Sequence, residues 1–252
     1  MFDLRLIRAE VLKLRKRPGM LAISAFITVA ASALAVVIPA ILHSSDPIKN
    51  GPAGGLENYT GTMSVITLMI IVVGAIVGST AGAQDLETGV FRDSAATGRS
   101  RMALFGARIP GALAIVLPLA AISAAIVAVG GVVFAGSLAA PSTSVIAGAT
   151  AAALAAAILS VTASVSLAAL TGSRGPVIGI VLAFELAISK LLLGITALGD
   201  ARDLIPNAAI DDIGHSPQAA VDMGLGVAVA VLLAWSVAAF AAGAWKTKTR
   251  EI

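Results

Sequence analysis

Six long stretches with very few charged residues follow one another along this chain, and they constrain its fold more than any other feature. A run of roughly 20 apolar residues is long enough to cross the hydrocarbon core of a membrane as a helix. The runs are too long for barrel strands, and backbone groups in lipid must bond within their own segment, so helices are expected. We therefore predict an all-α integral membrane protein with a single transmembrane domain over 1–252 and spans at about 20–42, 62–83, 109–136, 145–171, 176–198 and 223–244.

The charge content supports this class. Only 12% of the residues are charged, which is about half of the fraction usual in soluble domains, roughly 25%. The chain has no cysteine, so disulfides, thiolate metal sites and cysteine nucleophiles are all excluded.

Residues 2–17 predict an amphipathic helix that lies at the membrane interface before the first span. Leu4, Ile7, Val11 and Leu14 fall on one stripe of such a helix. The other faces are strongly basic, and basic side chains at this depth attract anionic lipid. In the alternative interpretation the segment is a plain basic anchor that only sets the topology. The basic residues are Arg5, Arg8, Lys13, Arg15, Lys16 and Arg17.

The basic residues also predict the orientation. Six spans place both termini on one side, and fourteen of the seventeen Lys and Arg residues then lie on that side. The positive-inside rule makes this side cytoplasmic, so we expect a multi-pass protein of a bacterial plasma membrane. Residues 199–222 form an outer segment with five aspartates, in which the apolar stretch LIPNAAI is expected to dip into the membrane or to cap the bundle.

Residues 84–101 form a charged loop between the second and third spans. This loop holds three acids and three arginines, and between residues 20 and 198 no other stretch is so polar for so long, apart from the Pro/Gly-rich loop after His43. A charged loop on the cytoplasmic side is a natural contact for a soluble partner. Its charged residues are Asp85, Glu87, Arg92, Asp93, Arg99 and Arg101.

Two ionisable residues fall within the predicted fifth span. Charges inside a membrane are costly, so Glu185 is expected to face the bundle interior or water. It is interpreted either as part of a substrate pathway or proton site, or as a structural hydrogen-bonding group. Lys190 is placed to extend toward the outer face. Five residues along an α-helix correspond to about 140° of rotation, so the two side chains are not expected to face each other.

Three glycines at four-residue spacing, Gly74, Gly78 and Gly82, leave one side of the second span bare. Such faces let membrane helices approach closely, so we predict a packing face, either within the subunit or across a dimer. The alternative is a chance spacing in a chain with 25 glycines.

The motifs of common catalytic sites are missing. The sequence has no Gly-Lys pair, and hence no Walker A motif. It also lacks a G-x-S-x-G elbow and an H-E-x-x-H motif. His43 and His215 are interpreted as solvated loop residues, and the Asp211-Asp212 pair as part of an acidic outer loop. We therefore expect no catalytic residue, no metal site and no nucleic-acid partner.

The order of these features resembles the ABC-2-type permease family, the membrane subunits of type-2 ABC exporters. A basic amphipathic segment ending in RAEVLKLRKRP precedes six spans, and the apolar DLIPNAAI precedes the last one. The loop after the second span matches the family's pattern at Glu87, Gly89, Arg92, Gly98, Arg99 and Arg101, although Val90 stands where threonine is frequent.

The resemblance implies a permease subunit that exports a substrate and is driven by separate ATPase subunits, which bind ATP and magnesium. A second copy or a sister permease would complete the transporter. The segment at 2–17 would be an elbow helix, with contacts from Arg8, Glu10, Lys13, Arg15, Lys16 and Arg17. The loop would be a coupling helix that contacts the ATPase through Asp85, Glu87, Gly89, Arg92, Asp93, Arg99 and Arg101.

Two other functions remain open. An ion-coupled secondary transporter would use Glu185 as its proton or ion site, and such folds commonly contain paired broken helices. A membrane scaffold that transports nothing is the other alternative.

Overall fold

The computed structural model describes residues 4–90 and 100–249, which are helical with short connections and contain no strand. The helical segments run in this order: α1 (Leu4–Arg15), α2 (Pro18–Ala25), η1 (Phe26–Ala30), α3 (Ala31–Ser45), α4 (Leu56–Glu87), α6 (Arg101–Val133), α7 (Thr143–Thr171), α8 (Arg174–Ala183), η2 (Phe184–Ile188), α9 (Ser189–Gly194), η3 (Thr196–Leu204), α10 (Pro206–Ile213) and α11 (Leu225–Thr249). Segments η1 and η2 are π-helical turns, and η3 is a 3₁₀ helix.

Six helices in the described part of the chain are long and apolar enough to cross a membrane: Pro18–Ser45, Leu56–Glu87, Arg101–Val133, Thr143–Thr171, Arg174–Gly194 and Leu225–Thr249. Each overlaps one of the predicted spans. The second span continues into the predicted charged loop, and the third begins eight residues earlier than expected, at Arg101. The fifth span ends at Gly194, because Ile195 has an extended backbone.

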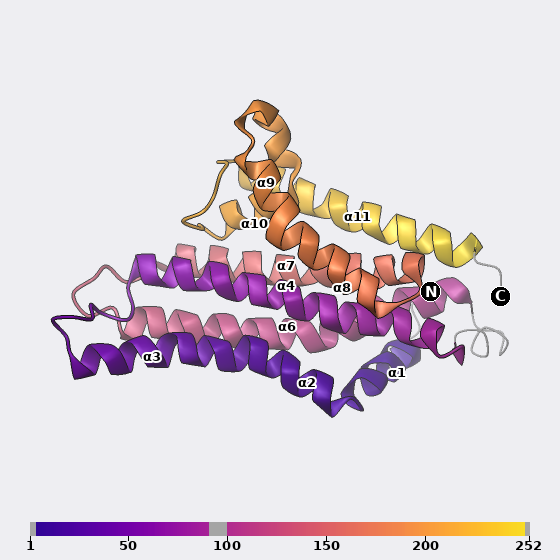
Figure 1. Cartoon of the computed structure of the whole chain (residues 1–252), viewed down its shortest axis with the longest axis horizontal. Helices are drawn as coiled ribbons and strands as arrows, with labels where there is room; N and C mark the ends of the chain where they lie inside the picture. Colours follow the sequence, from indigo (N-terminus) through magenta and orange to yellow (C-terminus); the bar gives the residue numbers. More distant parts are fainter. Residues whose placement is uncertain (1–3, 91–99, 250–252) are drawn as a thin grey trace.

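The helices form an elongated bundle (Figure 1). One end carries α1, the last turn of α4 and the last turn of α11, and we call it the α1 end. The other end, the far end, carries the connections between α3 and α4 and between α6 and α7.

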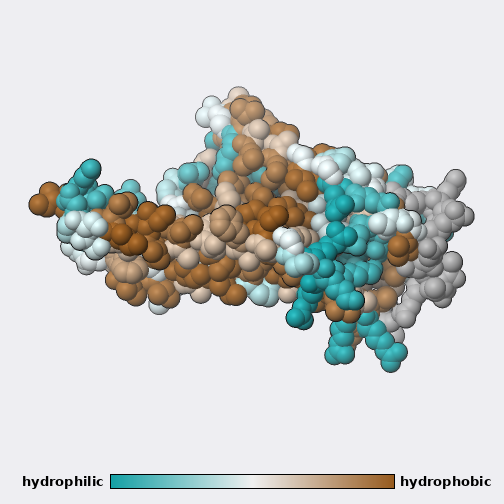
Figure 2. All heavy atoms as spheres, turned by 60° about the horizontal axis from the view of Figure 1, so that its bottom comes forward, coloured by the Kyte–Doolittle hydropathy of each residue, from teal (hydrophilic) through white to brown (hydrophobic). Residues whose placement is uncertain are grey.

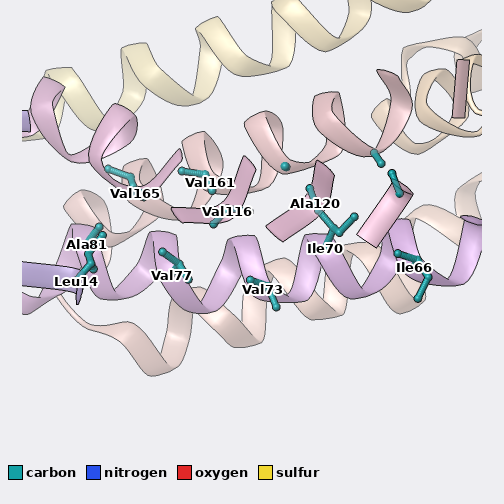
Figure 3. Close-up of a cluster of buried hydrophobic side chains, with 14 of the residues drawn as sticks. Leu14, Ile66, Ile70, Val73, Val77, Ala81, Val116, Ala120, Val161 and Val165 are labelled. Atoms are coloured by element: carbon teal, nitrogen blue, oxygen red, sulfur yellow. The ribbon is translucent and has the colours of Figure 1, made fainter. Parts of the chain in front are cut away.

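Helix α4 lies at the centre of the bundle because it packs against both α6 and α7. Its core side chains are spaced by three or four residues, so they share one face of the helix. Figure 3 shows this face pointing toward Val116 of α6 and Val161 of α7, with Leu14 of α1 beside Ala81. The core residues of α4 labelled there are Ile66, Ile70, Val73, Val77 and Ala81.

A second face of α4 meets α7 through glycines. A Cβ atom added at Gly74, Gly78 or Gly82 would lie within 3 Å of Ser160, Ser164 or Ala168, respectively. Both helices therefore present small residues at four-residue spacing, which allows their backbones to approach closely. The predicted packing face is occupied by α7 of the same chain.

The outer helices of the bundle leave much apolar surface exposed. Only 17% of the most apolar window of the first span and of the sixth span is buried, against 67% for α7. Figure 2 shows hydrophobic surface along most of the bundle's length, a large group of hydrophilic atoms at the α1 end and a smaller group at the far end. This distribution fits helices that lie against lipid.

Candidate functional site

Charged side chains meet between α1, α4 and α6 at the α1 end, and we call them the α1 cluster: Glu10, Lys13, Asp85 and Arg108. The Lys13 ammonium lies 2.8 Å from Glu10 Oε1 and 2.9 Å from Asp85 Oδ2. Arg108 reaches the same Asp85 oxygen at 3.3 Å and donates to the carbonyl of Gly82 at 2.8 Å. The cluster therefore ties the first helix to the two spans that flank the charged loop.

The α1 cluster is balanced and largely removed from solvent. Arg108 is only 2% exposed, Glu10 6% and Asp85 8%. Two acids face two bases, so the buried charges compensate one another, and losing one partner would leave its neighbour buried without compensation. Burial lowers the pKa of Lys13, but the hydrogen bonds and charges of Glu10 and Asp85 outweigh this effect and raise that pKa above its ordinary value.

A glycine lets α1 approach α6 at this point. A Cβ atom built at Gly111 would lie 2.7 Å from the Cβ of Glu10. The Cβ of Glu10 does not move when its side chain rotates. A side chain larger than glycine at position 111 would therefore clash with Glu10 in every rotamer. Leu14, one turn further along α1, is 1% exposed and packs in the core.

The position of Leu14 and Glu10 corrects part of the predicted interfacial stripe. Leu4 is 69% exposed, as a lipid-facing residue would be, but Leu14 packs inside the protein instead. Glu10 is also buried. Lys13 donates a hydrogen bond to its carboxylate, and Gly111 leaves space for its side chain beside α6.

A second ion pair joins the end of α4 to the start of α8. Glu87 accepts a hydrogen bond from the backbone N–H of Arg174 at 2.7 Å and one from its Nε at 2.8 Å. The carboxylate thus lies at the N-terminus of α8, where the helix dipole favours a negative charge.

The residues predicted to contact an ATPase are distributed unevenly. Asp85 lies within the α1 cluster, while Glu87 is paired with Arg174. Gly89 adopts a positive φ of 76° just after α4, and Arg101 begins α6. Arg92, Asp93 and Arg99 lie outside the described residues. Of the predicted elbow-helix residues, Glu10 and Lys13 face the bundle, and Arg8, Arg15 and Lys16 are exposed.

A second polar site, which we call the α10 cluster, lies where α10 packs beside the fifth span. Glu185 Oε2 accepts a hydrogen bond from Asn207 Nδ2 at 2.6 Å. Lys190 Nζ donates to Asp211 Oδ2 at 3.3 Å. Asn207 and Asp211 are four residues apart on α10, so both bonds join the same faces of the two segments.

The expectation that Glu185 and Lys190 point in different directions is therefore wrong. It assumed an α-helix, but Phe184–Ile188 forms a π-turn, in which the N–H of Ser189 bonds to the carbonyl of Phe184. A π-turn contains one more residue than an α-turn, so residues five apart lie nearly above one another. Glu185 and Lys190 consequently reach the same side of α10.

The segment before α10 descends toward the middle of the bundle. The indole N–H of Trp235 donates to the carbonyl of Leu204 at 2.8 Å, and its ring packs on Phe184 with 5.9 Å between ring centroids. Trp235 is ten residues into α11, roughly 15 Å from its start. The apolar stretch LIPNAAI thus packs on α11 and α7.

A cavity of about 130 Å³ lies between α4, α9 and α10, on the far-end side of the α10 cluster. Lys190, Asn207 and Asp211 line it together with Ser64 and Thr67 of α4. Burial raises the pKa of Asp211 above its ordinary value, and the Lys190 charge opposes this shift only in part.

Sequence reasoning missed three of the residues that build these clusters. Arg108 is one of the fourteen basic residues that predict the orientation, although it is almost fully buried in an apolar helix. Gly111, three residues later, is a small residue of the kind that lets membrane helices approach closely. Asn207 is the one amide within an apolar stretch, which indicates a buried partner.

Comparison with known protein families gives no matching family model, and no curated protein matches the sequence.

Proposed function

We propose that this chain is the permease subunit of an ATP-driven exporter and that separate ATPase subunits grip it at the α1 end. The observation that supports this proposal most directly is the α1 cluster. It binds α1 to the beginning of the charged loop and to α6, so a partner that contacts the loop also acts on three helices at once.

The lack of a nucleotide motif also fits a subunit that receives energy from a partner. The sequence has no Gly-Lys pair, so the usual phosphate-binding loop is absent from the chain. In this proposal the charged loop supplies the partner contact, and Asp85 acts as a positioning residue, because its carboxylate is already bonded to Lys13 and Arg108.

The first experiment is purification of the tagged chain from its native membrane in mild detergent, followed by identification of bound subunits and an ATPase assay. We expect a stoichiometric partner with a Walker A motif. Purification without any ATPase subunit or ATP hydrolysis, under conditions that keep the chain folded, would contradict the proposal.

A matched pair of variants tests the loop contact. The double variant Glu87→Arg with Arg92→Glu reverses two loop charges and should reduce the amount of ATPase that co-purifies. Arg174→Gln removes the same internal ion pair of Glu87 but leaves the loop charges in place, so it should retain the partner. Equal loss in both variants would assign the effect to the fold of α8 rather than to a partner contact.

The orientation in this proposal is tested by labelling. Because the chain has no cysteine, single cysteines at Lys49 and Thr249 report on opposite ends without background. In intact cells a membrane-impermeant maleimide should label only the Lys49→Cys variant. Labelling of only Thr249→Cys would place the α1 end outside.

A second candidate, an ion-coupled transporter, is favoured by one specific observation. The first and fifth spans both contain a π-turn, and the turn in the fifth span carries the buried Glu185. π-turns inside α-helices often lie at functional sites, and buried carboxylates within spans often mark proton or ion pathways. Loss of transport in Glu185→Gln, together with full activity in cells without the ATPase, would favour this candidate over the exporter.

A further inference from the structure

We propose that the groove between the first, second and fifth spans at the α1 end is a binding site for one phospholipid with an anionic headgroup. This site is separate from the α1 cluster and from the α10 cluster, and it requires only that the chain lies in a membrane. It does not depend on the proposed ATPase partner.

The groove has a floor and two walls from different spans. α4 contacts both α2 and α8, which lie on either side of it in Figure 1. Its Ile76 and Thr80 form the floor, and Ile76 is partly exposed in a stretch of α4 that is otherwise almost completely buried. The groove has a volume of about 530 Å³, which is within the usual range of ligand pockets, roughly 300–1,000 Å³.

The walls away from the α1 end are apolar. Met20 and Ile23 of α2 face the groove from one side, and Ile178 of α8 faces it from the other. Ile23 is 56% exposed. An acyl chain covers such a surface without loss of hydrogen bonds, whereas a soluble polar molecule would not.

The end of the groove next to α1 is basic. Arg17 and Arg174 lie there with Glu87, so the three formal charges sum to one positive charge. Glu87 is paired with Arg174, whereas the Arg17 guanidinium has no hydrogen bond or ion pair with a described residue, and only its backbone is bonded, to Leu14 and Leu21. A guanidinium without an acidic partner is suited to bind a phosphate group with two parallel hydrogen bonds.

The basic end and the apolar walls of the groove follow one another in the same order as the headgroup and the acyl chains of a phospholipid. The basic end of the groove is next to α1, and Figure 2 shows hydrophilic surface meeting hydrophobic surface at the α1 end. Phospholipid headgroups lie at such a boundary. Basic pockets between spans commonly hold anionic headgroups, with roughly fivefold tighter binding from each well-placed Lys or Arg. The headgroup phosphate would therefore bind at Arg17, with an acyl chain along Met20, Ile23 and Ile76.

Binding can be measured with the purified full chain in a nonionic detergent. Phosphatidylglycerol and phosphatidylcholine with identical acyl chains are titrated into the sample, and lipid retention is followed by native mass spectrometry. We expect at least about fivefold tighter binding of one phosphatidylglycerol. Glycerol 3-phosphate, the soluble headgroup analogue, should compete only weakly, because it lacks the acyl chains.

Two pairs of variants locate the site. Arg17→Gln should abolish the preference for phosphatidylglycerol, while Arg15→Gln, an exposed arginine of α1 outside the groove, should retain it. Ile23→Trp fills the groove and should weaken binding of both lipids. Ile41→Trp, at an equally exposed position of the same span, should not.

Three results would overturn the proposal. Equal loss of preference in Arg17→Gln and Arg15→Gln would show a diffuse attraction to the basic segment instead of a site. Equal lipid binding in the wild type and Ile23→Trp would exclude the groove. A change from dimer to monomer in Ile23→Trp, with lipid retention unchanged, would show that a second copy covers this face.

Discussion

The close contact between α4 and α7 allows a sharp test, because two glycines of α4 differ only in what lies beside them. A Cβ atom at Gly78 would lie 2.9 Å from Ser164 Cβ and 3.0 Å from the carbonyl oxygen of Val161. At Gly61, no described atom outside the local helix backbone lies within 4 Å of the added Cβ. The variants Gly78→Ala and Gly61→Ala therefore add the same atom to the same helix in opposite environments.

The expected difference in stability between the two variants comes from one contribution only, because the other contribution is the same in both. Replacing glycine by alanine within a helix favours the helix by about 1 kcal/mol in each case, so this contribution cancels in the comparison. Only Gly78→Ala overpacks the interface, and such overpacking costs about 1–3 kcal/mol. We expect the two variants to differ by that amount, which corresponds to about 2–12 °C in Tm for a chain of this size.

The assay is thermal unfolding of the purified protein in one detergent, with both variants measured beside the wild type. Adding Ser164→Gly to Gly78→Ala removes the nearest obstructing atom, so the double variant should be more stable than the sum of the single effects predicts. Equal Tm values for Gly78→Ala and Gly61→Ala, within about 1 °C, would refute the close-packing argument, since 1 kcal/mol already corresponds to about 2–4 °C.

Three further predictions follow from the clusters. Gly111→Leu should push α1 off α6, so that a cysteine at Leu14 reacts with a maleimide much faster than it does when Gly111 is present. Asn207→Ala should lower the free energy of unfolding by about 1–3 kcal/mol, because it leaves the buried Glu185 oxygen without its donor; the loss should shrink in a Glu185→Leu background. Since burial raises the pKa of Asp211, the folded state retains the proton of this carboxyl at a pH where the unfolded state has lost it. Stability should therefore fall as pH rises from about 3.8 through the raised pKa, and Asp211→Asn should make this fall smaller.

The number and order of the spans could be predicted because each span is a long apolar run in the sequence. A bilayer crossing requires a long apolar helix, and each of the six helices that are long and apolar enough overlaps a predicted span. The ends were less accurate, since α4 continues to Glu87 and α6 begins at Arg101. Charged residues ended the predicted spans, but they do not end a helix that extends beyond the hydrocarbon core.

The partners of the charged residues could not be predicted in the same way. Asp85 and Lys13 are 72 residues apart in the chain, and no local pattern indicates that they meet. The π-turn at Phe184–Ile188 was equally hidden, because a single extra residue in a turn leaves the apolar composition of a span unchanged. Both features depend on how two helices pack against each other, and the sequence of one helix does not specify which residues of another helix it contacts.

The two polar clusters have different physical consequences, and these bear on how a membrane bundle of this kind can move. In the α1 cluster, Asp85 and Arg108 belong to two spans and Lys13 to α1, so these three elements are expected to move as one body. In the α10 cluster both partners of the fifth span come from one short helix, which has its own connections on either side. Displacing α10 would break both bonds together and leave the Glu185 carboxylate without its donor, which is costly as long as this carboxylate stays buried. The α1 cluster thus joins three elements through shared ion pairs, whereas the α10 cluster depends on the position of one short helix.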